Sequence, residues 1–344
     1  MAVTPYYDDD WLTVYSGDCR AVLAELADES VHCVVTSPPY WGLRDYGHGD
    51  QLGLEPTPEA YVANMVAVFR EVRRVLRNDG TLWLNLGDSY ASGGDNRNGK
   101  GGSGLNSNPA ADVPMKAVVR TLAAGLKPKD LVGIPWRVAF ALQADGWYLR
   151  SDIIWAKPNP MPESVTDRPT KSHEYLFLLA KSERYYFDAE AVAESAQEWN
   201  GRAGEWGRDG NPVAEHVIPG QSAAQHRPRE SKARGSFNGK TEAMPGRNAF
   251  RAVTTTRNIR SVWTVATQPY PGAHFATFPP KLVEPCIKAG CPENGVVLDP
   301  FAGSGTVGMV AQRLSRRAVL IDLNPDYLMQ AMERNAAVPL GLVG

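Results

Sequence analysis

The sequence predicts an α/β fold in which a mostly parallel sheet carries helices on both faces and is interrupted by an irregular insert. From Trp11 to about Asp188, apolar runs of strand length alternate with longer segments of helical period. The alternation fades between about 189 and 262, where Gly, Pro, Asn and Arg accumulate, and it returns from about 263. We therefore expect a core built from residues 1–188 and 263–344, with residues 189–262 inserted between its two parts.

The composition predicts a soluble protein of the cytoplasm. The 344 residues are 43% apolar, which is enough for one or two hydrophobic cores. No apolar run approaches the roughly 18 residues of a membrane span, and the acidic start at Asp8–Asp10 differs from a signal sequence. The four cysteines, Cys19, Cys33, Cys286 and Cys291, form no disulfide or zinc pattern. We expect free thiols, no bound metal and no membrane partner.

The first part of the chain shows strands and helices in alternation. Ser30–Thr36 is short, β-branched and almost wholly apolar, as in a strand buried on both faces. Thr57–Glu59 supplies a capping hydroxyl, a proline and an acid for the start of a helix, which should end at Asn78–Gly80. Thr81–Leu86 then predicts the next strand, and the polar tract Gly93–Asn108 predicts a mobile loop.

The last part resumes the pattern around a glycine-rich loop. It predicts a helix near Pro280–Ala289, a strand at Val296–Asp299, a helix after Gly305, a strand at Ala318–Asp322 and a last helix from Asn324. The loop thus joins the end of a strand to the start of a helix, which is the position of nucleotide-binding loops in α/β sheets.

The loop sequence VVLDPFAGSGTVG, Val296–Gly308, narrows the choice of cofactor. It lacks the lysine of a phosphate-binding ATP loop. Its G-x-G-x-x-G spacing, with Asp322 at the end of the next strand, fits a dinucleotide with a ribose diol. However, Asp299 before the glycines would repel a pyrophosphate. It would suit a cationic or zwitterionic ligand without phosphate, such as S-adenosyl-L-methionine.

A second motif, TSPPYW at Thr36–Trp41, follows the buried strand and emerges at the carboxyl edge of the sheet, where α/β ligands bind. Together, TSPPYW and VVLDPFAGSGT resemble the catalytic and cofactor motifs of the amino-group DNA methyltransferases, which methylate cytosine N4 or adenine N6. Ser16–Cys19, Leu84–Tyr90, Ile154–Pro162 and His274–Pro279 also resemble segments of that family. The order resembles its permuted beta group, in which the catalytic motif comes first, the target-recognition region follows and the cofactor loop is last.

The resemblance implies the Rossmann-like fold of S-adenosylmethionine-dependent methyltransferases, with S-adenosyl-L-methionine as the cofactor. Residues 1–188 would carry the catalytic motif, 189–262 the target-recognition region and 263–344 the cofactor loop. Asp18 would bind the adenine edge of the cofactor and Asp322 its ribose. The implied cofactor-binding residues are Asp18, Phe278, Asp299, Phe301, Gly303, Gly305, Thr306 and Asp322, with the two phenylalanines as pocket walls.

The implied catalytic residues are Ser37, Pro38, Pro39 and Tyr40. The two prolines stiffen the backbone and keep Ser37 out of helical geometry. The Ser37 hydroxyl and the Pro38 carbonyl can then accept the two amino hydrogens of the target base, while Tyr40 stacks on the base face. Because the target atom is inaccessible inside a duplex, the base must be flipped into this pocket.

A basic segment predicts double-stranded DNA as the partner. Between His226 and Arg260, nine arginines and lysines accompany two glutamates, a net charge of +7 in a chain whose total is −2. The DNA-binding candidates are Arg227, Arg229, Lys232, Arg234, Arg247, Arg251, Arg257 and Arg260. A solvated linker is the alternative interpretation of this segment.

The target base and several rival functions stay open at this stage. In the family, Ser-Pro-Pro-Tyr goes mainly with the cytosine amino group and Asp-Pro-Pro-Tyr with adenine. We therefore expect methylation of cytosine N4, with adenine as the alternative. RNA or protein methylation, an inactive DNA-binding protein and a nicotinamide dehydrogenase are the other hypotheses. The sequence leaves open the recognition site, a homodimer and a companion restriction endonuclease.

Several of these residues also have purely structural interpretations. Asp18 and Asp322 can each cap the helix that follows them. Trp41 is by default a core aromatic residue. Cys286 follows a proline, as does the thiolate of the ring-carbon cytosine methyltransferases, but its spacing predicts the buried face of a helix and no catalytic role.

Overall fold

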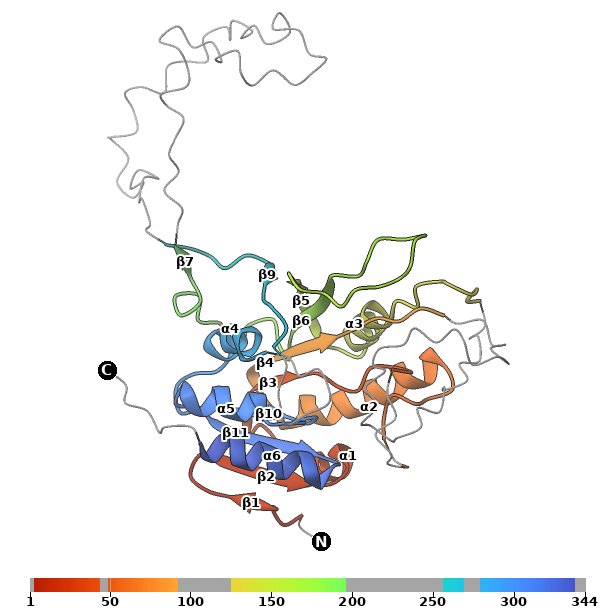
Figure 1. Ribbon diagram of the computed structural model, residues 1–344. Helices are drawn as coiled ribbons and strands as arrows, with labels where there is room; N and C mark the ends of the chain where they lie inside the picture. Colours follow the sequence, from red (N-terminus) through yellow and green to blue (C-terminus); the bar gives the residue numbers. More distant parts are fainter. Residues whose placement is uncertain are drawn as a thin grey trace, which may run out of the picture. The chain divides into compact units, whose positions relative to one another are not determined.

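The computed structural model describes residues 3–43, 49, 51–91, 125–195, 256–268 and 279–337 (Figure 1). The chain divides into two compact units, one of Met1–Val192 with Arg260–Gly344 and one of Ala193–Ile259. Within the smaller unit, the structure describes a short antiparallel pair, β7 (Glu194–Ser195) and β8 (Thr256–Arg257). The predicted loop at 93–108, Phe278 and most of the basic segment lie outside the described residues.

The larger unit is built on a nine-stranded sheet. Its strands lie in the spatial order β1 (Tyr7–Asp8), β2 (Leu12–Ser16), β11 (Arg317–Asp322), β10 (Val296–Asp299), β3 (Val31–Thr36), β4 (Leu76–Leu86), β6 (His173–Ala180), β5 (Tyr148–Ala156) and β9 (Val262–Thr264). β6 runs antiparallel to both neighbours, β1 runs antiparallel to β2, and the other neighbouring pairs are parallel. The prediction of a mostly parallel sheet is confirmed.

Helices cover both faces of this sheet, as predicted (Figure 1). One group, which shares a hydrophobic core, contains α1 (Cys19–Glu25), α2 (Pro58–Val75) and α3 (Ile134–Ala144). The other group contains α4 (Pro280–Gly290), α5 (Thr306–Arg313) and α6 (Pro325–Ala336). From α4 to α6, the elements of the last part begin within one residue of their predicted starts, and α4, β10 and β11 also end within one residue of their predicted ends.

β10 and β3 lie side by side at the centre of the sheet, although they come from opposite ends of the chain (Figure 1). They pair in parallel, with Val297 opposite Cys33 and Leu298 opposite Val34. All four side chains are fully buried, as expected for strands covered on both faces. This pairing brings the glycine-rich loop and TSPPYW to the same edge of the sheet.

The helix predicted from Thr57 ends earlier than expected. Thr57 caps α2 as predicted, and its hydroxyl accepts an amide hydrogen bond at 3.1 Å. The predicted end at Asn78–Gly80 is wrong, because the helix ends at Val75 and β4 already begins at Leu76. Leu76 is fully buried and pairs with Val31, so it fills the core from an extended backbone. The polar residues that follow lie where the register between β3 and β4 shifts.

The cysteines are buried free thiols. Cys286 lies on the buried face of α4, as predicted, and burial holds the pKa of its thiol well above the ordinary value. In the part of the chain that the structure describes, no helix is long and apolar enough to span a membrane. The same residues contain no cluster of three or more His, Cys, Asp or Glu side chains that could hold a metal ion.

Candidate functional site

The carboxyl edge of the sheet gathers polar side chains from six neighbouring strands. β2, β11, β10, β3 and β4 end at this edge, and β6, which runs the other way, begins there. Along the edge, the strands carry in order Asp18, Asp322, Asp299, Ser37, Asn85 and Glu174. Three acids thus lie at the ends of neighbouring strands beside the glycine-rich loop, and three polar side chains, Ser37, Asn85 and Glu174, lie beside or within TSPPYW.

Asp299 ends β10 and is fully buried. Its Oδ1 accepts hydrogen bonds from the Thr36 hydroxyl at 2.7 Å and the Phe301 amide at 3.1 Å. Its Oδ2 is buried and has no partner among the described residues. Burial raises the pKa of this carboxyl to about 7, although the two hydrogen bonds act in the opposite direction. A buried oxygen without a donor is unfavourable, so this position favours a ligand that is cationic or donates a hydrogen bond.

Two glycines of the loop are needed for different reasons. Gly305 caps α5 with a φ of +72°, and a Cβ there would lie 2.6 Å from the Cβ of Ala331 in α6. Gly303 has a φ of +50°, but a Cβ there would meet none of the described residues within 4 Å. Gly305 therefore lets α6 approach the loop, whereas the backbone at Gly303 faces open space that a ligand can enter.

Asp322 ties the loop to the end of β11. Its Oδ2 accepts a hydrogen bond from the Gly303 amide at 2.7 Å, and its Oδ1 accepts one from the Asn324 amide at 2.8 Å. The helix cap of α6 is Asn324 itself, whose side chain accepts from the Asp326 amide at 2.9 Å. The alternative interpretation of Asp322 as the cap is therefore wrong, and its role toward a ribose stays a prediction.

Thr306 and Ser304 are held by Arg334 of α6, which no sequence pattern indicated. The guanidinium donates to the Thr306 hydroxyl at 2.8 Å and to the Ser304 hydroxyl at 3.2 Å. Thr306 is buried at the first position of α5, so this contact holds the end of the loop against α6. Phe301 is half-buried and packs against the core, and its role as a pocket wall stays a prediction.

Asp18 caps α1, which confirms its structural interpretation. Its Oδ1 accepts a hydrogen bond from the Arg20 amide at 2.8 Å, and the carboxylate also forms an ion pair with the Arg20 guanidinium. These contacts hold the pKa of the carboxyl below its usual value, chiefly through the Arg20 side chain. An adenine bound by Asp18 would compete with Arg20, so the predicted cofactor contact stays untested.

Ser37 lies half-buried at the start of the loop after β3. Its hydroxyl donates to Asn85 Oδ1 at 3.2 Å and lies 3.4 Å from the Tyr40 hydroxyl. The Pro39 carbonyl accepts a hydrogen bond from Tyr61 at 2.9 Å. Among the described residues, no donor reaches the Pro38 carbonyl. Ser37 Oγ and the Pro38 carbonyl oxygen, which the sequence predicted as acceptors, can therefore each still accept a hydrogen bond from a ligand.

Tyr40 is fixed at both its ring and its hydroxyl. The hydroxyl donates to Glu174 Oε2 at 2.8 Å and lies 3.0 Å from Asn85 Oδ1. A Cβ at Gly87 would lie 2.3 Å from the Tyr40 ring, so only glycine allows the ring this close to β4. Burial and the nearby Glu174 raise the pKa of Tyr40 well above its usual value, which keeps the phenol protonated. Stacking of this ring on a base stays a prediction.

Three polar residues of this network had no role predicted from the sequence: Asn85, Lys157 and Glu174. Asn85 is 1% exposed within the apolar run of β4, and an amide in such a run was the available signal. Lys157 forms an ion pair with Glu174, and its ammonium lies 4.2 Å from the centre of the Trp155 ring. The proximity of Lys157 and Glu174 to Ser37 could not be predicted without knowing that β6 lies between β4 and β5.

The remaining candidates are only partly described. Arg257 pairs with Glu194 at 3.0 Å within the smaller unit. Arg260 is exposed, and the other DNA-binding candidates lie outside the described residues. Trp41 is a buried core residue, as its structural interpretation predicted, with its indole donating to the Glu55 carbonyl at 2.8 Å.

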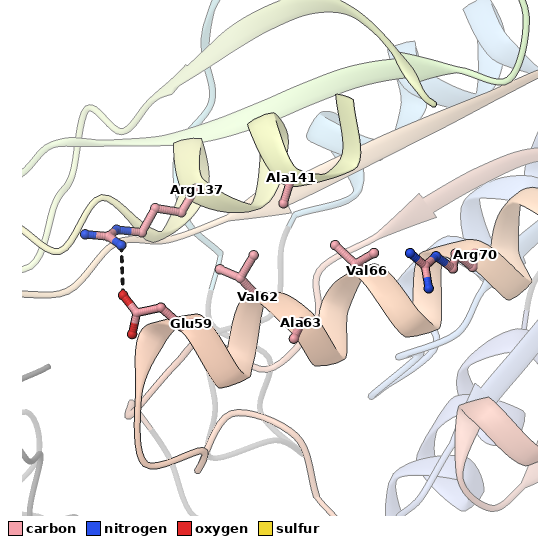
Figure 2. Close-up of a pocket in the computed structure, with 7 residues that line it drawn as sticks. All are labelled: Glu59, Val62, Ala63, Val66, Arg70, Arg137 and Ala141. Carbon is pink, nitrogen blue, oxygen red and sulfur yellow. Dashed lines mark hydrogen bonds and ion pairs between the residues drawn. The ribbon is translucent and has the colours of Figure 1, made fainter. Parts of the chain in front are cut away.

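A surface groove between α2 and α3 contains none of the candidate catalytic, cofactor-binding or DNA-binding residues. Its walls include Val62 and Val66 of α2 and Ala141 of α3, and the Glu59–Arg137 ion pair closes one end (Figure 2). The groove therefore belongs to the helical face and not to the carboxyl edge of the sheet.

Three comparisons with known proteins agree with one another. A family model described as DNA methylase matches residues 31–333. The chain is 47% identical over 322 residues to the Type II methyltransferase M.Cfr9I of Citrobacter freundii, across 94% of this chain and 87% of that protein. The structure resembles PvuII DNA methyltransferase (cytosine-N4-specific), with a TM-score of 0.58 and 18% identity over 96% of this chain and 88% of that one. It also resembles TTHA0409 of Thermus thermophilus complexed with S-adenosyl-L-methionine, with a TM-score of 0.53 and 23% identity over 95% and 94% of the two chains. The two structural likenesses concern the fold.

Gly305→Ala should destabilise the protein more than Gly303→Ala. Each change places alanine in the left-handed region, at a cost of about 1–2 kcal/mol. Only at Gly305 would the new Cβ also collide with Ala331, which adds about 1–3 kcal/mol. Urea unfolding of the two variants measures the difference in unfolding free energy. Equal losses of stability would show that a Cβ at position 305 does not collide with Ala331 of α6.

Asp299→Asn should change how stability depends on pH. The pKa of about 7 in the folded protein lies above the ordinary value near 4, so the folded state favours the protonated form. The contribution of Asp299 is therefore complete below about pH 4 and is lost as the pH rises to about 7. Asparagine does not titrate. Without cofactor, the unfolding free energy of Asp299→Asn should thus gain on the wild type between those limits.

The matched control for this measurement is Asp10→Asn, which neutralises an exposed acid. This control separates the effect from the general loss of one negative charge, so Asp299→Asn should gain on it between the same limits. If Asp299→Asn ran parallel to the wild type from about pH 4 to about pH 7, the buried carboxyl would not have the raised pKa.

Proposed function

Because the chain belongs to the N6/N4 family of DNA methylases, we propose that it transfers a methyl group to the 4-amino group of a flipped cytosine in duplex DNA. The chain is a DNA methyltransferase with the fold of the S-adenosylmethionine-dependent enzymes, and its cofactor is S-adenosyl-L-methionine. The choice of cytosine rather than adenine, and the roles of single residues, are the proposed part.

The first residue of the catalytic motif supports cytosine as the target. The motif here is Ser-Pro-Pro-Tyr, the form that goes mainly with the cytosine amino group in the family, and not Asp-Pro-Pro-Tyr. The structurally similar PvuII enzyme is named as cytosine-N4-specific, although a likeness at 18% identity supports the fold more than the target. The observation that carries the proposal is the contact of the Ser37 hydroxyl with Asn85 Oδ1 at 3.2 Å, which provides an acceptor for its hydrogen within the protein.

The residues around the glycine-rich loop fit the cofactor. The unpartnered Oδ2 of Asp299 provides a buried acceptor for a cationic or amino group. The open space at Gly303 admits a ligand to the loop backbone, and Asp322 lies at the strand end where an acid binds a ribose diol. Bound there, S-adenosyl-L-methionine supplies an electrophilic methyl group on a sulfonium centre.

The catalytic motif would hold the amino group in a reactive geometry. An exocyclic amino nitrogen is a poor nucleophile, because its lone pair is delocalised into the base ring. Since Ser37 donates its own hydrogen to Asn85, its Oγ is left to accept one amino hydrogen, and the Pro38 carbonyl accepts the other. These two bonds favour a pyramidal nitrogen whose lone pair is available.

Positioning, rather than proton removal, would account for most of the acceleration. A serine hydroxyl is too weak a base to deprotonate the amino group before methyl transfer, so the surplus proton passes from the methylated nitrogen to water afterwards. Holding the reacting groups in line can contribute roughly 7–11 kcal/mol. The fixed ring of Tyr40 would stack on the base, and flipping the base costs a few kcal/mol.

Ser37→Ala should remove most of the turnover but leave cofactor binding unchanged. Loss of a hydrogen bond to the reacting amino group lowers kcat by about 100-fold or more, whereas the cofactor site is untouched. The direct measurement is digestion of methylated DNA followed by mass spectrometry of the nucleosides, which should show N4-methylcytosine for the wild type. Calorimetry with S-adenosylhomocysteine gives the cofactor affinity.

The control for this variant is Ser30→Ala, the same change just before the other end of β3, where the hydroxyl donates to the Ala27 carbonyl at 2.7 Å. It should keep both turnover and product. N6-methyladenine as the product would overturn the cytosine assignment. Full turnover of Ser37→Ala would remove Ser37 from the site, whichever base is methylated.

We also propose that the basic segment contacts DNA phosphates. Replacing Arg227, Arg229 and Arg234 together by glutamine should reduce the salt dependence of DNA affinity, by roughly 0.9 in slope for each phosphate that the variant no longer neutralises. Fluorescence anisotropy of a labelled duplex at several salt concentrations measures the slope. A slope equal to that of the wild type would show that the segment is a solvated linker.

A further inference from the structure

A chain of part-buried polar contacts runs along the carboxyl edge of the sheet to Ser37. It begins at Lys157 after β5, passes through Glu174 of β6 and Asn85 of β4, and ends at the Ser37 hydroxyl. The side chains of Lys157 and Glu174 are only 17% and 16% exposed. Such a pair loses much of its hydration, so its presence beside the motif calls for a reason other than stability.

Glu174 uses its two carboxylate oxygens in opposite directions. Oε1 faces the ammonium of Lys157. Oε2 accepts hydrogen bonds from the Tyr40 hydroxyl at 2.8 Å and the Asn85 amide nitrogen at 3.3 Å. Both oxygens therefore act only as acceptors, and only a carboxylate offers acceptors on both sides.

These contacts determine which way the Asn85 amide points. Its nitrogen donates both hydrogens, one to Glu174 and the other to the Tyr175 carbonyl at 3.0 Å. In the reversed orientation, the amide oxygen would face those two acceptors, and the Ser37 hydroxyl would face the amide nitrogen instead of an acceptor. The contacts around Asn85 thus admit one orientation, with Oδ1 toward Ser37.

We propose that Glu174, held by Lys157, is a positioning residue that keeps Asn85 an acceptor and thereby keeps the Ser37 oxygen free for the amino hydrogen of the base. The proposal rests on the role of Ser37 in the proposed function. With Asn85 Oδ1 in place, the Ser37 hydroxyl hydrogen has a fixed acceptor within the protein. Without it, that hydrogen can turn toward the base and repel the amino group. The network thus favours a base that donates a hydrogen bond to Ser37 Oγ over a base that presents an acceptor there.

Glu174→Gln should slow methyl transfer without weakening cofactor binding. A glutamine side chain has one acceptor and one donor, so it cannot accept from Lys157 and from Tyr40 and Asn85 at once. The single-turnover rate at saturating DNA and cofactor should fall by about 10- to 100-fold, while the dissociation constant of S-adenosylhomocysteine stays within about twofold. A wild-type single-turnover rate would overturn the proposal.

The effect should depend on Ser37, which a purely structural role would not require. In a Ser37→Ala background, adding Glu174→Gln should cost clearly less than it does alone, because the hydroxyl that Glu174 orients is absent. Equal fold-losses in both backgrounds would show that Glu174 acts independently of Ser37 and would overturn the proposal.

A double variant tests the hydrogen-bond pattern itself. In Lys157→Met with Glu174→Gln, the ammonium is gone, so the glutamine oxygen is free to turn toward Tyr40 and Asn85 and restore their acceptor. This double variant should recover at least about tenfold of the rate lost by Glu174→Gln. It also carries no unpaired buried charge, so it provides a folded protein if the single variant unfolds. The proposal would be overturned if the double variant folds but its single-turnover rate is no higher than that of Glu174→Gln, or no higher than that of Ser37→Ala.

The matched control is Glu163→Gln. Glu163 forms an ion pair with Arg168 at 2.6 Å on the segment between β5 and β6, at 29% and 24% exposure. Its carboxylate also accepts from the Lys171 amide at 3.4 Å, so its described contacts stay within that segment. The single-turnover rate of this variant should equal that of the wild type. The rate counts methyl groups on either base, so N6-methyladenine as the product would refute the cytosine proposal and leave the Glu174 test intact.

Discussion

The hydrogen bond from the Thr36 hydroxyl to Asp299 Oδ1, 2.7 Å long, joins the two halves of this site. Its partners are 263 positions apart in the chain, fully buried, and last in two paired central strands. The candidate catalytic residues begin at Ser37, directly after Thr36, and the part of the cofactor loop that leaves the sheet begins directly after Asp299. A small shift between Thr36 and Asp299 would therefore change the distance between base and cofactor, on which in-line methyl transfer depends. Burial of both groups makes any loosening unfavourable, because each would lose a partner.

The two halves differ in their electrostatics in a way that suits their ligands. On the cofactor side, Asp322 and Asp299 end neighbouring strands, and Asp299 keeps one oxygen without a donor among the described residues. A cationic ligand relieves both the repulsion between acids and the missing contact. On the base side, the charge of Glu174 is matched by Lys157, and Asn85 is neutral. A neutral amino group thus meets oriented dipoles rather than a net charge, which favours precise direction over strong binding.

Local patterns predicted the elements that carry the motifs, because caps, glycines and buried strands act over a few residues. The bounds of β10 and the cap at Thr57 are examples. The end of α2 was mispredicted because Asn78–Gly80 looks like a helix stop, whereas the burial of Leu76 against β3 had already ended the helix. The network around Asn85 was not predictable. It requires β6 to enter the sheet between β4 and β5, a choice made by long-range packing.

The antiparallel direction of β6 is what makes that network available to the motif. In a parallel strand at this position, the residues at the catalytic edge would come from its carboxyl end, near Ala180, and Glu174 would lie toward the opposite edge. Because β6 begins at the catalytic edge, its second residue reaches Tyr40 and Asn85 while β5, ending there, supplies Lys157. A fold that ties one acid to both neighbouring strands gains little stability from the pair itself. What it gains is a unique direction for each hydrogen bond, since the contacts around the acid leave one arrangement in which every donor has an acceptor.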